Sequence, residues 1–265
     1  MSLKHLIPSF RARYRFLERS VAAAAESSAL GRVLNVGCGE GDFDAMLRAH
    51  CGELVCVDLS ETDIAHARAR NADTPGLHYA VEDALALSFA SGSFDLVCCT
   101  EVIEHVRDPV ALLRELARVA GRGHTIVLTA PNRDFPVTYD PINRVLARLG
   151  KHLPIGGYAY GHTWLVDDAE FRGWCAAIGL DVVASERLTG AVAALPEAYT
   201  LGLLQALLKA NAKNDGGPGR AFALKPNATR APWLARVTDR VNALDRARLA
   251  RGAPSVGLGY VLRVR

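Results

Sequence analysis

The chain has 265 residues with a net charge of +3, and half of them are hydrophobic, enough for one large α/β domain or two small ones with a substantial core. We expect no secretory signal, because the first twenty residues contain no apolar stretch of the required length. The six cysteines form no C-x-x-C pair, and several lie in apolar runs. We therefore expect buried free thiols in a reducing cytoplasm.

Apolar periodicity predicts strands that alternate with helices from the amino terminus onward. The first half of the chain contains, in order, a helix over 9–20, a strand over 31–37, a helix over 42–50, a strand over 53–60, a helix over 61–72, and strands over 76–83 and 93–100. Ser60 is the expected N-cap of the helix that follows it, and Glu61 and Asp63 in its first turn complement the helix dipole.

The second half continues this pattern, with a helix over 108–120, a strand over 124–131, a helix over 167–179, and strands over 180–188 and 255–265. Pro109 in the first turn and Gly121 just after the last turn mark the bounds of the first of these helices. The last strand alternates as an edge strand would. Strands that alternate with helices predict a mostly parallel sheet covered by helices on both faces.

Two segments interrupt the alternation, 131–163 and 188–254. The first 21 residues of the second segment contain a single charge, Glu197, and are long enough to span a bilayer, but Pro196 and Gly202 interrupt them. We expect a buried or lid helix here and no transmembrane segment. A helix lying on a membrane surface is the alternative.

The ends of the chain are basic. Residues 1–20 carry five Lys/Arg and one acid (+4), and residues 181–265 carry thirteen and six (+7), so that residues 21–180 must carry −8. This segregation favours an anionic partner such as a phosphate, a nucleic acid or a membrane surface. Arginine-rich, solvated helix faces are the alternative interpretation.

The stretch VLNVGCGEGDF places Gly37, Gly39 and Gly41 between the first strand and the next helix. Glycines there let the backbone approach a ligand closely, and the helix start offers free amides. The spacing is not the dinucleotide fingerprint G-x-G-x-x-G, because Asp42 stands where the last glycine belongs. Asp42 would also repel a pyrophosphate.

Two acids end the second and third strands. Asp58 can accept two hydrogen bonds from a ribose diol, and Asp83 can accept one from an adenine amino group. A glycine loop and two acids at the ends of three successive strands predict a nucleoside-containing cofactor.

These stretches, together with FDLVCCTEVIEHVRDP, LARVAGRGHTIVLTAPN and DAEFRGWCAAIGLDVV, resemble the class I S-adenosylmethionine-dependent methyltransferases over about residues 30–187 and again at the last strand. The resemblance implies an α/β, Rossmann-like, doubly wound seven-stranded sheet with its last strand antiparallel, and S-adenosylmethionine as cofactor. Asn35 stands where many relatives carry an acid, so we expect weaker cofactor ordering. The implied cofactor contacts are Gly37, Cys38, Gly39, Gly41, Asp58, Leu59, Asp83, Ala84 and Thr100.

We expect two domains. Residues 1–187 and 255–265 would form the methyltransferase domain, and residues 188–254 an α-helical cap or lid for the acceptor, inserted before the last strand.

The stretch TEVIEHVRD places Glu101, Glu104 and His105 at i, i+3 and i+4, on one face of a helix. His162 precedes a helix and is expected at the same end of the sheet. Oxygen and nitrogen donors in this mixture suit Mg²⁺, Mn²⁺, Co²⁺ or Zn²⁺. The alternative is a set of hydrogen-bonded structural residues.

EVIEH followed by GHTW resembles two groups, the small-RNA 3′-terminal 2′-O-methyltransferases and the ubiquinone-pathway O-methyltransferases. In the first group, two Glu and two His side chains hold a divalent metal. The resemblance implies that the corresponding ligands here are Glu101, Glu104, His105 and His162. It also implies that His105 and His162 are catalytic. Such a metal lowers the pKa of a hydroxyl and orients it for attack. Residues 131–161 depart from both groups, which leaves the acceptor open.

We therefore expect a methyltransferase that O-methylates a hydroxyl of a small-molecule or lipid-linked acceptor, an anionic one included, with peripheral membrane contact as an option. An RNA 2′-O-methyltransferase is the alternative, supported by the basic carboxyl-terminal region but not by its few aromatic residues, Phe222, Trp233 and Tyr260. A non-catalytic protein on the same fold is the third hypothesis. The intact loop with Asp58 and Asp83 argues against it.

Overall fold

The computed structural model describes residues 3–133, 145–146, 148–151, 165–194, 197, 233 and 235–265. The chain divides into two compact units. We call residues 13–131, 166–186 and 258–265 the sheet unit, and residues 1–12, 132–165 and 187–257 the insert unit. The lid helix expected after Pro196 lies outside the described residues, and the predicted cap over 188–254 stays a prediction.

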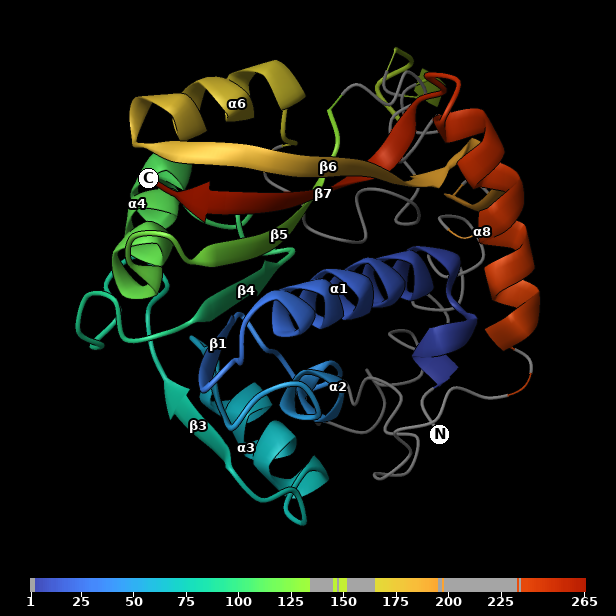
Figure 1. Cartoon of the computed structure of the whole chain (residues 1–265). Helices are drawn as coiled ribbons and strands as arrows, with labels where there is room; N and C mark the ends of the chain where they lie inside the picture. Colours follow the sequence, from blue (N-terminus) through green and yellow to red (C-terminus); the bar gives the residue numbers. More distant parts are fainter. Residues whose placement is uncertain are drawn as a thin grey trace. The chain divides into compact units, whose positions relative to one another are not determined.

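The described strands form one sheet of seven in the order β3-β2-β1-β4-β5-β7-β6 (Figure 1). Strands β3, β2, β1, β4 and β5 pair in parallel. Gly123 donates its amide to Val264 at 2.9 Å at one end of β7, and Asn132 donates to Val256 at 2.8 Å near the other end, so β7 runs antiparallel to β5. The predicted fold is confirmed. The bounds are β1 Arg32–Val36, β2 Glu53–Asp58, β3 Leu77–Val81, β4 Leu96–Thr100, β5 Thr125–Pro131, β6 Leu180–Gly190 and β7 Ser255–Val264.

The prediction that the last strand is an edge strand is wrong, because β7 lies between β5 and β6. Its alternation comes from glycines rather than from exposure. A Cβ atom at Gly259 would lie 2.7 Å from the ring of Phe16, so a helix packs closely on that face. Tyr260 points to the other face, where its ring stacks on Phe171 with centroids 4.1 Å apart and its hydroxyl donates to Asp168 at 2.7 Å.

Two of the helices begin at side-chain caps, of which the sequence predicts Ser60. Ser60 accepts a hydrogen bond from the amide of Asp63 at 3.2 Å, as predicted, and Asp108 accepts one from Ala111 at 2.9 Å. A short 3-10 helix, Leu3–Leu6, precedes α1. Among the described residues, the α-helices include α1 Pro8–Ser27, α2 Asp44–Arg48, α3 Glu61–Arg70, α4 Pro109–Ala120, α6 Asp168–Ala177 and α8 Ala235–Leu249.

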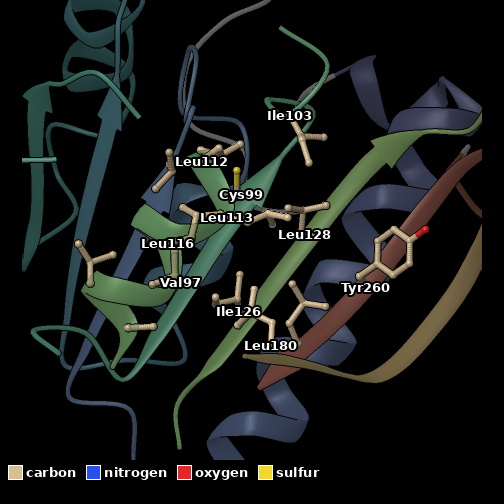
Figure 2. Packing of buried hydrophobic residues seen from close by; sticks show 14 of the residues in the cluster. Val97, Cys99, Ile103, Leu112, Leu113, Leu116, Ile126, Leu128, Leu180 and Tyr260 are labelled. Carbon is tan, nitrogen blue, oxygen red and sulfur yellow. The ribbon is translucent and has the colours of Figure 1, made fainter. Parts of the chain in front are cut away.

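The core of the sheet unit lies between α4 and the middle of the sheet (Figure 2). Leu112, Leu113 and Leu116 of α4 are fully buried and face the side chains of β4 and β5, such as Cys99 and Leu128. Near-continuous apolar strands are what a parallel sheet covered on both faces requires. This packing fixes β4 and its carboxyl end, where the candidate site begins.

Asp245 of α8 is a buried structural acid of the insert unit. Its carboxylate accepts hydrogen bonds from the backbone amides of Gly190, Val192 and Ala193 at 3.0–3.3 Å. The end of β6 is thereby joined to α8.

We predict that Asp245→Ala lowers stability by about 3 kcal/mol or more, because it leaves buried amides without their acceptor. Asp245→Asn should lose less, since it keeps one acceptor oxygen. Urea unfolding measures both, with exposed Arg246→Ala as the control on the same helix. A wild-type unfolding curve for Asp245→Ala would contradict this role.

Candidate active site

Four strand ends bring the predicted cofactor residues to one edge of the sheet unit. Strands β1, β2, β3 and β4 are parallel neighbours, so their carboxyl ends share that edge. The glycine loop 37–41 follows β1, Asp58 ends β2, Asp83 follows β3 and Thr100 ends β4. The sequence predicts that these four segments lie together at this edge.

The glycine loop adopts a backbone that only glycine tolerates well. Gly37, Gly39 and Gly41 have φ angles of 69°, 52° and 77°. The amides of Gly37 and Cys38 both donate to the carbonyl of Val57, at 2.8 and 3.0 Å, and tie the loop to β2. A Cβ atom at Gly39 would have no other atom within 4 Å, so the loop faces open space there.

Asp58 supports this loop and keeps acceptor capacity. Its two carboxylate oxygens accept from the amides of Gly39 at 2.8 Å and Ser60 at 3.0 Å. The residue is half-buried, and each oxygen has a second lone pair for a ligand hydroxyl. Leu59 beside it is 73% exposed, an apolar surface that suits the face of a nucleobase. Asp83 is also exposed and accepts from Leu85 at 2.9 Å.

Behind the loop lies a buried polar network that the sequence analysis missed. Asp44 of α2 is fully buried and accepts from Asn35 Nδ2 at 2.8 Å and from the Tyr79 hydroxyl at 2.6 Å. Asn71 Nδ2 lies 2.9 Å from the Tyr79 oxygen and 3.4 Å from the carbonyl of Gly41. Burial raises the pKa of Asp44, and hydrogen bonds from Tyr79 and Asn35 oppose that shift. The sequence signal for this network was Asp44, an acidic residue in a helix whose neighbouring positions are apolar.

The stretch after β4 is not helical, and the helix expected there is wrong. Glu101 has a φ of 55°, and α4 begins only at Pro109. Its amide donates to the carbonyl of Thr129 at 3.1 Å, and its carboxylate accepts from the Thr129 hydroxyl at 3.0 Å. The same carboxylate forms an ion pair with Arg13 of α1 at 2.8 Å. Arg13 lies 88 residues away in sequence, so no local pattern could have indicated it.

Two of the other predicted metal ligands, Glu104 and His105, lie three and four residues after Glu101. Glu104 is fully buried, and its Oε1 lies 3.8 Å from Nε2 of exposed His105. Burial, followed by repulsion from Glu101, raises the pKa of Glu104 to about 9. His162 lies outside the described residues.

Within the described part of the chain, one set of three His, Cys, Asp or Glu side chains has its ligand atoms within 4.8 Å of one another. It consists of Glu40, Asp63 and His66, and so differs from the predicted set. Exposed acids are common without an ion, and this geometry alone does not define a site.

The sheet order, the glycine loop and the acids at the strand ends define the fold and cofactor edge of the class I methyltransferases. A protein-family model described as "Methyltransferase domain" matches residues 34–128. Over these residues the chain is therefore similar to a methyltransferase domain. The open space at Gly39 and the acceptor oxygens of Asp58 would fit S-adenosylmethionine as cofactor.

Curated relatives are ubiquinone biosynthesis O-methyltransferases. The chain is 32% identical over 160 residues to that of Albidiferax ferrireducens (strain ATCC BAA-621 / DSM 15236 / T118), which covers 57% of this chain and 60% of the relative. It is 28% identical over 198 residues to that of Aromatoleum aromaticum (strain DSM 19018 / LMG 30748 / EbN1), covering 72% and 78%. The first alignment thus spans less than two thirds of the relative's length.

Solved structures share the fold. Magnesium protoporphyrin IX methyltransferase (ChlM) from Synechocystis PCC 6803, with S-adenosylhomocysteine bound, matches with a TM-score of 0.54 at 18% identity over 69% of this chain and 80% of that chain. The [4+2]-cyclase SpnF matches with a TM-score of 0.55 at 16% identity over 93% and 80%. The second example carries a different reaction on this fold, so the fold alone does not fix the chemistry.

Proposed function

We propose that the chain is an S-adenosylmethionine-dependent O-methyltransferase that acts on a hydroxyl of a small-molecule or lipid-linked acceptor. The observation that carries this proposal is the open glycine loop held by Asp58 at the carboxyl edge of the sheet. The acceptor class follows from the ubiquinone biosynthesis relatives. S-adenosylmethionine, when bound, supplies an electrophilic methyl group on a sulfonium.

In this proposal the residues of the edge bind and orient the cofactor. Asp58 accepts the ribose hydroxyls, Leu59 covers one face of the adenine, and Asp83 accepts from the adenine amino group. Backbone atoms of the other predicted contacts line the remaining surface, at Gly37, Cys38, Gly39, Gly41, Ala84 and Thr100. With the cofactor held, orientation of the acceptor hydroxyl supplies much of the rate.

Asp58→Ala should weaken S-adenosylhomocysteine binding by about 1.5–3 kcal/mol, because it removes charge-assisted hydrogen bonds to the ribose. Calorimetric titration measures the change. The control is Asp73→Ala, an exposed acid elsewhere in the sheet unit, which should bind as the wild type does. An unchanged affinity for Asp58→Ala would remove this residue from the ribose site.

We further propose that a divalent metal assists the reaction, held by Glu104, His105, His162 and Glu101. Support comes from the 3.8 Å separation of Glu104 Oε1 and His105 Nε2, which allows both to reach one ion. Glu101 is bonded to Arg13 and Thr129, so its carboxylate would have to leave Arg13 or be shared with it. The metal would be Mg²⁺, Mn²⁺, Co²⁺ or Zn²⁺.

If this metal proposal holds, chelator abolishes methyl transfer while S-adenosylhomocysteine binding stays intact, and an added divalent ion restores turnover. His105→Ala and His162→Ala should then lower activity and metal content together, whereas exposed His78→Ala should not. Full activity after prolonged chelation would leave a methyltransferase that works by positioning alone.

Residues 188–254 are proposed as a helical lid for the acceptor, in a cytoplasmic protein with peripheral membrane contact. Supporting observations are the described helix α8 and the position of this segment between β6 and β7. None of the helices in the described part of the chain has the length and apolar character needed to cross a bilayer.

A further inference from the structure

Helix α8 of the insert unit has a buried face that hydrogen-bonds to other segments of this unit. Ala235, Thr238, Asn242, Asp245 and Leu249 follow one another at spacings of three and four, and all are buried. The Thr238 hydroxyl donates to the carbonyl of Leu6 at 3.4 Å, and Asn242 Nδ2 donates to that of Pro8 at 3.0 Å. With the three amides at Asp245, these bonds fix which side of α8 faces outward.

The opposite side carries a second stripe at the same spacing, which we call the outer stripe. It consists of Trp233, Val237, Arg240, Leu244, Arg248 and Arg251, separated by four, three, four, four and three residues and all exposed. Trp233 precedes the helix, and Arg251 follows it. Trp233, Val237 and Leu244 are 72%, 52% and 65% exposed, so the stripe presents large apolar side chains to solvent.

The outer side of α8 is strongly basic. Its exposed cations are Arg240, Arg248 and Arg251. Both acids of the helix are engaged, Asp239 in a bidentate ion pair with Arg11 at 2.8 and 2.9 Å, and Asp245 with backbone amides. Three arginines without a balancing acid of the helix on that side favour an anionic partner.

The segment that directly precedes α8 in sequence does not supply this negative charge. Residues 198–232 carry five Lys/Arg and one Asp, a net +4. A symmetric contact between the outer stripes of two copies would bring the same arginines together. Like charges oppose both contacts.

We infer that the outer stripe docks on a membrane surface that contains anionic phospholipid. A helix that alternates arginine with Trp, Val and Leu along one face matches the interface, where headgroup phosphates pair with guanidinium groups and apolar side chains enter the acyl boundary. The arginine stems add apolar contact while their heads stay at the phosphates. Val237 and Leu244 have no comparable use against RNA, whose bases stack on aromatic rings. This docking rests on the peripheral membrane contact proposed above and is independent of methyl transfer, so docking and methyl transfer can fail separately.

Vesicle sedimentation with the full chain tests the inference. Vesicles of phosphatidylcholine with about one third phosphatidylglycerol should bind the chain, and vesicles of phosphatidylcholine alone should bind it at least about tenfold more weakly, since each Arg at an anionic surface adds to the affinity. The triple variant R240E/R248E/R251E should lose at least about tenfold in partitioning. The matched control R114E/R122E/R263E reverses three exposed arginines of the sheet unit and should behave as the wild type does.

The apolar residues of the outer stripe, Trp233, Val237 and Leu244, are tested separately. Val237→Ser with Leu244→Ser should weaken vesicle binding while S-adenosylhomocysteine affinity stays the same. Tryptophan emission should shift to the blue on anionic vesicles, and Trp233→Phe should remove that shift. Equal binding to neutral vesicles, or unchanged partitioning of R240E/R248E/R251E, overturns the inference. So does tighter binding of a generic oligoribonucleotide that depends on the same arginines.

Discussion

Gly37→Ala should cost the chain about 3 kcal/mol or more of stability and abolish S-adenosylhomocysteine binding. Two causes add. The φ of 69° is unfavourable for any residue with a Cβ atom, and that atom would overlap the Val102 side chain. Thermal or urea unfolding measures the loss. The double variant Gly37→Ala with Val102→Ala should recover part of it, because the overlapping methyl group is removed.

Gly39→Ala is the matched control for this experiment. Its φ of 52° carries the backbone penalty, but its Cβ atom would have no other atom within 4 Å. Gly39→Ala should therefore fold with a smaller loss of stability and still bind S-adenosylhomocysteine poorly, because the added methyl group enters the space left for the cofactor. Equal destabilisation of the two variants would contradict the described loop geometry, and tight binding by Gly39→Ala would place the cofactor elsewhere.

Asp44→Ala should weaken S-adenosylhomocysteine binding at least about tenfold, although Asp44 lies behind the loop. A Cβ atom at Gly41 would meet both Asp44 Oδ2 and Asn71 Nδ2 at 2.7 Å, so the network packs directly against the loop backbone. Loss of the carboxylate leaves the donors of Asn35 and Tyr79 buried without their acceptor. The loop would then lose its support.

The pair Asn35 and Asp44 permits a swap that separates positioning from stability. Asn35→Asp alone should destabilise the fold, because two carboxylates would share one buried contact of 2.8 Å. Asn35→Asp with Asp44→Asn restores one carboxylate and one amide and should recover S-adenosylhomocysteine affinity relative to Asp44→Asn. If the single variants lower the melting temperature but leave affinity unchanged, Asp44 only stabilises the fold.

The strands and helices of the sheet unit could be predicted because their signals are local. Apolar runs predicted strands β1 to β5, and Ser60 and Pro109 predicted where α3 and α4 begin. The position of β7 could not be predicted, because Gly257 and Gly259 imitate the alternation of an edge strand. Their small size instead serves close packing, which at Gly259 is against Phe16.

The cofactor edge was predictable and the polar contacts around it were not. Glycine spacing and acids at strand ends follow directly from the parallel topology. In contrast, the helical spacing of Glu101, Glu104 and His105 was misleading, since the positive φ of Glu101 breaks the helix before it starts. The pairing of Glu101 with Arg13 joins segments that only the folded chain brings together.

Titration of S-adenosylhomocysteine into the purified chain by calorimetry tests the central claim most directly. A methyltransferase site at Gly37–Gly41 and Asp58 predicts one site per chain with a dissociation constant in roughly the micromolar range, about −8 kcal/mol. It also predicts a higher melting temperature in the presence of the ligand. No heat of binding and no thermal shift at millimolar ligand, from a chain that is folded by circular dichroism, would contradict it.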